Sequence, residues 1–328
     1  MSVLVTGGAG YIGSHMVLGL LDSGEDVVVL DNLSTGLRSA VPNSAKFAQG
    51  DVGDREFVKR LLTDNDIDAV MHFAGSVVVP QSLLEPLSYY QNNTCNSRTL
   101  IECVVEAGIE HFIFSSTAAV YGMPPTSLVD EDAPLEPISP YGSSKLMTEI
   151  MLRDAAQAHD FSYVVLRYFN VAGADPLGRA GQSTEAATHL IKVAAEAALG
   201  HREYLEVYGT DYPTRDGTCV RDYIHVSDLI AAHWSALRYL RGGGQSETFN
   251  CGYGRGYSVL DVVGCTKRVA GSDFPVRLRN RRPGDPATLV ARADRLTEKL
   301  NWRPRYDKLD TIISHALAWE KRCAKRPP

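Results

Sequence analysis

The first 21 residues constrain the fold of this chain more than any other segment. The apolar run Val3-Leu4-Val5-Thr6 ends in the glycine-rich segment 7–13, and residues 14–21 then have the spacing of a helix. Residues 8–13 fit the pattern G-x-G-x-x-G, in which bare backbone lets a pyrophosphate approach the N-terminus of a helix. A strand, a glycine turn and a helix in this order predict the start of a Rossmann-type sheet that binds a dinucleotide.

An acidic residue follows at the spacing that such sheets use. The second apolar run, 26–30, leads into Asp31, 18 residues after Gly13. A carboxylate at the end of the second strand can accept hydrogen bonds from the adenosine ribose hydroxyls. Because it would repel a 2′-phosphate, we predict NAD rather than NADP as the cofactor. A glycine turn followed by a capping aspartate is the structural alternative.

Strands and helices continue to alternate as far as residue 170. The pattern predicts strands at 45–49, 68–75, 111–116 and 162–170, and helices at 55–63 and 86–108. Ligands bind outside the carboxyl ends of parallel strands, so Asp51, Phe73 and Ala74 are expected to line the adenine and ribose. His72 lies inside an apolar strand and is predicted to be a packed histidine rather than a catalyst. The predicted fold class is therefore α/β, with a doubly wound parallel sheet.

The alternation stops after residue 170, where we place a domain boundary. Residues 1–170 are predicted to form the dinucleotide-binding Rossmann domain, and residues 171–328 a smaller mixed α/β domain that binds the substrate. The segment near 218–228 is expected to pack back on the first domain. In the second part, the pattern predicts helices at 184–199, 227–240, 259–270 and 309–321, and short strands at 204–208 and 218–225.

Tyr141 and Lys145 form a candidate catalytic pair. Ser139 followed by Pro140 is a good N-cap and first helical position, so a helix should begin here and place the pair one turn apart. An ammonium about 4 Å from a phenol favours the phenolate by up to ~4 kcal/mol at intermediate dielectric. Tyr141 could then accept a proton from a substrate hydroxyl, and Thr117, at the preceding strand end, could bind the same oxygen. Tyr and Lys also fall four residues apart on many helices by chance.

Two arginine segments in the second half suit a diphosphate. Arg221 lies in a predicted strand, and Arg282 lies in the segment 281–285, which ends in Asp285. Planar guanidinium groups donate in pairs to phosphate, and a neighbouring carboxylate suits ribose hydroxyls. A surface salt bridge explains either segment at least as well from the pattern alone.

Composition argues against several other classes of protein. The net charge is −6 over 328 residues, which does not favour a general nucleic-acid surface. No apolar run reaches the ~18 to 20 residues of a membrane span, and the N-terminus lacks the pattern of an export signal. Six scattered cysteines without zinc spacing predict no metal site and reduced thiols in a cytoplasmic protein.

Taken together, these residues resemble the extended short-chain dehydrogenase/reductase family, and within it the enzymes that epimerise UDP-hexoses at C4. The similarity runs nearly from end to end. Its most specific segments are 5–15, 72–75, 89–93, 114–117, 139–145, 166–170, 217–226 and 281–285. The resemblance implies reversible C4 epimerisation of UDP-glucose and UDP-galactose through a 4-keto intermediate, with transient hydride transfer to a tightly bound NAD.

The resemblance also implies a role for each candidate residue. Tyr141 would be the base, Lys145 would hold the nicotinamide ribose and lower the pKa of Tyr141, and Thr117 would bridge the sugar oxygen. The residues implied to bind NAD are Gly7, Gly10, Tyr11, Ile12, Gly13, Asp31, Asn32, Asp51, Val52, Phe73, Ala74, Gly75, Asn92, Ser115, Tyr141, Lys145 and Tyr168. Those implied to bind the UDP-sugar are Thr117, Tyr141, Asn170, His189, Leu190, Tyr208, Arg221, Arg282, Asp285 and Leu289. A homodimer is also implied, joined by the helix 86–108 and the helix of Tyr141 in a four-helix bundle.

Some positions depart from the family pattern and leave alternatives open. Thr117 stands where serine is usual, and His189 where some relatives have asparagine. Leu289 aligns with the residue whose bulk decides whether an N-acetylated sugar fits, so a 4-epimerase of a UDP-N-acetylhexosamine is an alternative, as is one of a uronate or pentose. Dehydratases of the family place an Asp-Glu pair where this chain has Ala118-Ala119. A non-catalytic NAD-binding regulator is a further alternative, although it needs no Tyr-Lys pair.

Overall fold

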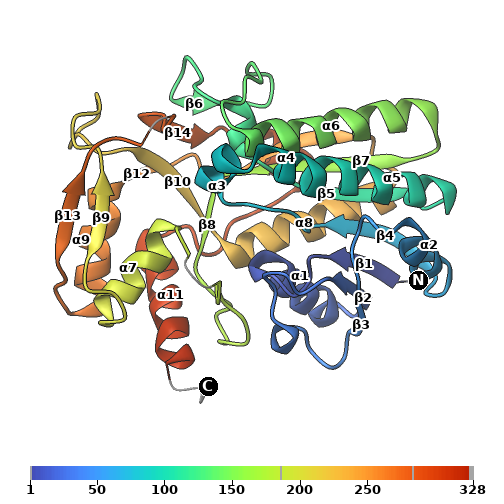
Figure 1. Ribbon diagram of the computed structural model, residues 1–328, viewed down its shortest axis with the longest axis horizontal. Helices are drawn as coiled ribbons and strands as arrows, with labels where there is room; N and C mark the ends of the chain where they lie inside the picture. Colours follow the sequence, from blue (N-terminus) through green and yellow to red (C-terminus); the bar gives the residue numbers. More distant parts are fainter. Residues whose placement is uncertain (1, 185–186, 283, 325–328) are drawn as a thin grey trace.

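A seven-stranded parallel sheet forms the centre of the computed structural model (Figure 1), which describes residues 2–184, 187–282 and 284–324. The strand order is β11-β7-β5-β4-β1-β2-β3, and every neighbouring pair is parallel. The order reverses at β1, which confirms the predicted doubly wound α/β fold. The strands are β1 (Ser2–Thr6), β2 (Asp26–Asp31), β3 (Lys46–Gln49), β4 (Ile67–His72), β5 (His111–Thr117), β7 (Ser162–Tyr168) and β11 (Glu247–Cys251).

Helices cover both faces of this sheet because successive residues of a strand point to opposite sides. Val3 and Val5 of β1 pack in the core under α1 and α8, whereas Leu4 packs in the core under α2, α5 and α6. These helices are α1 (Tyr11–Asp22), α2 (Arg55–Thr63), α5 (Asn96–Glu106), α6 (Pro140–Ala158) and α8 (Val226–Arg241). Within the described ranges, no helix is both long and apolar enough to cross a membrane.

The predicted helix over 86–108 contains a wide turn. After α4 (Pro86–Tyr89), residues Tyr90–Cys95 form a π-helical turn that leads into α5. Such turns occur frequently at functional sites, and this one carries Asn92, a predicted cofactor ligand. The short helix α3 (Val79–Leu84), which the sequence pattern did not indicate, precedes it.

A smaller mixed sheet, seen at the left of Figure 1, is built by strands of the second half of the chain together with β6 of the first half. Its strand β10 pairs with β8 and β14 in parallel and with β12 in antiparallel orientation, and β14 pairs with β6. Strands β9 and β13 form a separate parallel pair. The elements are β6 (Leu128–Val129), β8 (Asn170–Ala172), α7 (Leu190–Ala198), β9 (Leu205–Tyr208), β10 (Val220–His225), β12 (Gly256–Ser258), α9 (Val259–Ala270), β13 (Val276–Arg279), β14 (Thr288–Ala291), α10 (Asp294–Leu300) and α11 (Leu309–Cys323).

The domain division at residue 170 stays a prediction, and the path of β11 and α8 qualifies it. Strand β11 extends the seven-stranded sheet beside β7, and α8 packs against α1 and β7. Residues 226–251 therefore lie with the layers of the first half, although they follow the proposed boundary. The segment near 218–228 is expected from the sequence to pack back on the first domain; its strand β10 lies in the smaller sheet, and α8, which follows, packs against α1 and β7.

The helix predicted over 184–199 is shorter in the structure. Helix α7 begins at Leu190, and His189 takes the N-cap position with extended backbone. Residues 185 and 186 of that prediction lie outside the described residues.

Candidate active site

Backbone contacts close the glycine turn between β1 and α1. Gly7 has φ +69°, and a Cβ there would lie 2.6 Å from the amide nitrogen of Ala74. A Cβ on Gly13 would lie 2.1 Å from the carbonyl oxygen of Gly7. Gly10 is the N-cap of α1 and has no side chain with which to bond the N–H groups of the first turn. These groups suit an anion, so the turn fits the pyrophosphate of a dinucleotide.

Asp31 ends β2 at the same edge of the sheet. Its carboxylate is 8% exposed and accepts the N–H groups of Ala9 (2.9 Å) and Leu33 (2.8 Å). Because a carboxylate has about four acceptor positions, it retains capacity for ribose hydroxyls. Asn32 donates to the carboxylate of Asp51 (2.8 Å). This hydrogen bond joins the loop after β2 to the loop after β3, where the adenine of the cofactor is predicted to bind.

The loop after β4 connects the cofactor candidates to the catalytic pair. Residues 73–75 directly follow β4, and a Cβ on Gly75 would lie 3.6 Å from Nζ of Lys145. Asn92 donates to the hydroxyl of Ser76 (2.9 Å), so the π-helical turn also reaches this loop. The structure thus brings together candidates from the loop after β4, the π-helical turn and α6.

Tyr11 extends from the glycine turn to the second half of the chain. Its hydroxyl donates to the carbonyl of Gly173 (2.7 Å), and burial raises its pKa. Val52 is buried in the core on one face of the sheet and Ile12 packs against the core on the other face, so these two cofactor candidates offer backbone or apolar contacts. A cavity beside the turn is lined by the start of α1 and by residues from two loops, 35–40 and 179–184.

Polar residues at the end of β5 hold Lys145. The ammonium donates to the carbonyl of Ser115 (3.0 Å) and lies 4.8 Å from the centre of the Phe114 ring. The Ser115 hydroxyl donates to the hydroxyl of Tyr168 (2.7 Å). Burial lowers the pKa of Lys145 to about 8, and the negative charge of Glu149 opposes this shift. Three predicted cofactor ligands therefore meet at one strand end.

Helix α6 places Tyr141 in its first turn. The Ser139 hydroxyl accepts the N–H of Gly142 (3.2 Å), and Pro140 occupies the first helical position, so the predicted cap is confirmed. Tyr141 is 7% exposed, and its phenol hydrogen-bonds with the side chain of Thr117. The two predicted catalytic hydroxyls are therefore adjacent.

The protonation of Tyr141 differs from the prediction. Burial raises the pKa of Tyr141 above its ordinary value, and the hydrogen bond with Thr117 lowers it by less. The expected net lowering of this pKa is not seen, because a buried phenolate loses its hydration and the Lys145 ammonium is directed at the Ser115 carbonyl, so a compensating effect of Lys145 stays a prediction. Any phenolate that forms here needs a compensating positive charge.

Four predicted UDP ligands contact one another in two pairs, Arg221 with Asp285 and Arg282 with Tyr208. The guanidinium of Arg221 lies 3.5 Å from the carboxylate of Asp285, and that of Arg282 lies 3.7 Å from the centre of the Tyr208 ring. The N–H of Asp285 donates to the carbonyl of Arg282 (3.4 Å). A partly exposed ion pair contributes little stability by itself, whereas two guanidinium groups, one of them over an aromatic ring, suit a nucleoside diphosphate.

Asn170 and Leu289 lie in the two strands that pair with β10 in parallel. Asn170 donates to the carbonyl of Asp222 (3.3 Å), and Leu289 of β14 pairs with Arg221 in the sheet register. Leu289 is 9% exposed and packs in a core cluster with Ala118, which follows β5. Leu289 therefore links Arg221, a predicted UDP ligand, to the core cluster that contains Ala118, which directly follows the predicted catalytic residue Thr117.

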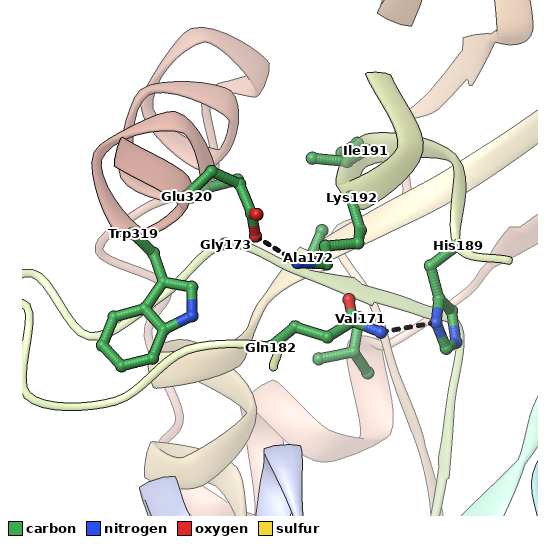
Figure 2. Close-up of a pocket in the computed structure, with 10 residues that line it drawn as sticks. Val171, Ala172, Gly173, Gln182, His189, Ile191, Lys192, Trp319 and Glu320 are labelled. Atoms are coloured by element: carbon green, nitrogen blue, oxygen red, sulfur yellow. Dashed lines mark hydrogen bonds and ion pairs between the residues drawn. The ribbon is translucent and has the colours of Figure 1, made fainter. Parts of the chain in front are cut away.

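His189 and Leu190 mark the start of α7. Nδ1 of the exposed His189 accepts a hydrogen bond from Gln182 (2.8 Å), as Figure 2 shows, and Leu190 packs against the core of the second half. Both polar side chains line a cavity between β8, α7 and α11, which also contains the ion pair of Lys192 and Glu320. The ring of His189 is thus oriented by a neighbouring side chain.

His72 is a packed residue, as the sequence predicts. Its ring lies 2.7 Å from the hydroxyl of Thr6 and 2.8 Å from that of Ser97, and it is 1% exposed. Burial lowers its pKa to about 3, so the imidazole stays neutral.

Two buried charged residues near the site were not predicted. Glu149 follows Lys145 by one turn of α6 and forms an ion pair with Arg167 (2.6 Å), and both are at most 7% exposed. Charged side chains are rarely buried unless paired. A glutamate at helical spacing after the lysine was the signal in the sequence.

Comparison with known proteins agrees with this geometry. Residues 3–252 match the model of the NAD dependent epimerase/dehydratase family. A UDP-glucose 4-epimerase of Azospirillum brasilense is 58% identical over 319 residues, which cover 97% of this chain and 92% of that protein. The crystal structure of UDP-glucose 4-epimerase from Brucella ovis in complex with NAD is 44% identical, with a TM-score of 0.94 and 97% of both chains covered. The UDP-Glc/GlcNAc 4-epimerase of Campylobacter jejuni is 48% identical, with a TM-score of 0.86 and coverage of 98% and 99%.

Proposed function

Because the chain belongs to the NAD dependent epimerase/dehydratase family, we propose that it interconverts UDP-glucose and UDP-galactose by inverting C4 of the hexose. The observation that carries the proposal is the contact of the Tyr141 phenol with Thr117, beside Lys145 and a glycine turn that fits a dinucleotide. The similarity to UDP-glucose 4-epimerases over nearly the whole chain supports the choice of substrate. Bound NAD supplies a hydride acceptor and donor at C4.

Tyr141 is the proposed proton acceptor and donor. It takes the proton from the C4 hydroxyl as that oxygen becomes a carbonyl, and returns it when the opposite face of C4 is reduced. Thr117 contacts the phenol and is placed to share the same sugar oxygen. Because burial disfavours the phenolate, the buried Lys145 ammonium is the group proposed to compensate its charge.

The UDP portion is proposed to stay fixed while the keto sugar turns over. Arg221 and Arg282 would hold the diphosphate, and Asp285 would bind the ribose hydroxyls. Tyr208 and Asn170, which lie at the edge of the second half, would complete the nucleotide site. Holding the nucleotide end lets both faces of C4 reach one hydride position.

UDP-N-acetylhexosamines are the second candidate substrates. Leu289 is smaller than an aromatic residue and larger than a glycine, so the space it leaves for an N-acetyl group is intermediate. A relative of this chain at 48% identity is named a UDP-Glc/GlcNAc 4-epimerase, which supports this candidate. Parallel assays with both pairs of UDP-sugars would separate the two activities.

The active form is proposed to be a cytoplasmic homodimer. Exposed apolar side chains gather on α3, α4 and α6, which pack against one another, and these are Leu83, Leu84, Leu87, Met147 and Ile150. Such a patch suits a second copy of the same chain joined through helices. Free thiols at Cys95, Cys103, Cys219, Cys251 and Cys265 support a reducing compartment.

A Tyr141→Phe variant tests the proposed reaction. Loss of the phenolic hydroxyl should lower kcat for UDP-galactose by about 10² to 10⁴-fold, because general acid–base catalysis contributes that much. Tyr239→Phe on α8, a partly buried position that packs against the core, is the matched control and should retain wild-type kcat. Turnover of UDP-galactose by Tyr141→Phe at the wild-type rate would contradict the proposal.

A further inference from the structure

A buried ionic network lies next to Lys145. Glu149 is one turn further along α6 and is 7% exposed. Its carboxylate accepts N–H groups of Arg167 at 2.6 Å and 3.1 Å, and it also accepts the hydroxyl of Ser116. Arg167 donates in turn to the hydroxyl of Tyr121 (3.1 Å). Charge-assisted and bidentate hydrogen bonds of this kind fix the groups that they join.

The network is attached to the strands one residue before two predicted site residues, the catalytic candidate Thr117 and the cofactor candidate Tyr168. In the register of β5 and β7, Ser116 pairs with Arg167, and the next pair is Thr117 with Tyr168. Paired residues of neighbouring strands project to the same face, so Ser116 and Arg167 present their side chains together to Glu149. Glu149 therefore ties α6 to both strands where they reach the site.

We propose that Glu149 is a positioning residue, which fixes the Lys145 turn of α6 against β5 and β7 and balances the charge of the Lys145 ammonium. It acts through Lys145 and needs no contact with the sugar or the cofactor. The effect on turnover rests on the proposed epimerase function, whereas the coupling between Glu149 and Lys145 is a property of the folded chain.

Glu149 supplies the negative charge among the groups around Lys145, and Arg167, its ion-pair partner, supplies a second positive charge. The other titratable side chains there are Tyr141 of α6, Tyr168 of β7 and His72 of β4. Burial lowers the pKa of His72 to about 3 and raises the pKa values of both phenols, so these three are neutral near pH 7. Burial also lowers the pKa of Lys145 to about 8, against the opposing effect of Glu149. Removing this negative charge should lower the pKa of Lys145 further, toward neutrality.

Direct titration of Lys145 tests the coupling. ¹³C NMR of protein with labelled lysine side chains follows each ammonium, and the Lys145 signal is identified by its loss in Lys145→Met. In Glu149→Gln the Lys145 midpoint should fall by about 1 pH unit or more, because a nearby opposite charge stabilises the ammonium by that amount. An unchanged midpoint would overturn the proposal. The NMR titration tests the coupling even if the wild-type protein epimerises no UDP-sugar. Such a lack of activity would refute the proposed function but not the coupling.

The pH profile of turnover separates positioning from simple stability. Lys145 is charged below its pKa, so the alkaline limb of kcat should move to lower pH in Glu149→Gln. Glu149→Asp keeps the negative charge, so the alkaline limb of kcat and the titration midpoint of Lys145 should both stay in place. The shorter aspartate side chain should nevertheless reduce kcat. Glu149→Asp also decides the matter if Glu149→Gln does not fold, since a displaced midpoint in the aspartate variant contradicts the proposal.

Glu25→Gln is the matched control for loss of a partly buried ion pair. Glu25 pairs with Arg241 (2.8 Å) and is 17% exposed, and this pair belongs to neither α6 nor the strand ends. The variant should lose stability without moving the Lys145 midpoint or the alkaline limb. If Glu149→Gln behaves like Glu25→Gln, with kcat unchanged or reduced equally at all pH values, Glu149 has a structural role only.

Discussion

The Asp31 carboxylate illustrates how one residue decides which dinucleotide is bound. It accepts two backbone N–H groups and is 8% exposed, so its position is fixed before any ligand binds. The hydroxyls of an NAD ribose can donate to its remaining lone pairs, whereas the 2′-phosphate of NADP would bring a second negative charge close to it. Like charges about 4 Å apart repel by ~4 kcal/mol at the effective dielectric of a protein surface.

Asp31→Asn should weaken the preference for NAD over NADP. Removing the charge removes the repulsion, so the ratio of the two dissociation constants should change by at least about tenfold, equivalent to ~1.4 kcal/mol. Isothermal titration of cofactor-free protein with each dinucleotide measures the ratio. Asp54→Asn, at the N-cap of α2, is the control and should leave the ratio unchanged. An unaltered ratio in Asp31→Asn would contradict the role given to its charge.

For single residues, the sequence predicted where the site residues lie better than it predicted their protonation states. Tyr141, Thr117 and Lys145 could be placed because a helix cap and a strand end are local patterns. The pKa of Tyr141 could not, because it depends on how completely the surrounding elements exclude water. Glu149 escaped prediction for a similar reason, since its partner Arg167 is brought to it by strand pairing.

Helix α6 carries the catalytic tyrosine in its first turn, so its N-terminal cap affects both stability and turnover. Ser139→Ala should lower the free energy of unfolding by about 1 kcal/mol, because the N–H of Gly142 loses its partner. It should also lower kcat more than it changes KM, since Tyr141 is displaced. Ser258→Ala removes the corresponding cap of α9 and should lower stability alone. Equal kinetic effects in both variants would contradict the positioning of Tyr141 by its cap.

Elements with a strong local period were predicted, whereas several short strands that depend on distant pairing were not. The bounds of α2 and α9 agree with the apolar spacing, and the central strands with continuous apolar runs. The strand β11 joins the first sheet only through pairing with β7, some eighty residues earlier in the chain. The short strands β6, β12 and β14 likewise depend on their partners in the smaller sheet.

For the whole molecule, the apolar patch on α3, α4 and α6 predicts self-association. Leu84 and Leu87 are 83% and 79% exposed. Burying both in two copies would contribute roughly 6 to 12 kcal/mol, at 1.5 to 3 kcal/mol for each side chain. The double variant Leu84→Asp, Leu87→Asp should therefore sediment as a monomer where the unmodified chain sediments as a dimer. Leu177→Asp, in an exposed loop, should not change the mass. A dimer that survives the double variant would place the interface elsewhere.

The chemistry at C4 is tested most directly with UDP-galactose that carries deuterium at C4. Purified protein is incubated with this substrate without added NAD, and the product is analysed by NMR and mass spectrometry. The account predicts UDP-glucose that retains the deuterium at C4, because the hydride is removed and returned within one active site. UDP-glucose that has exchanged this deuterium with solvent, or no UDP-glucose at all, would contradict it.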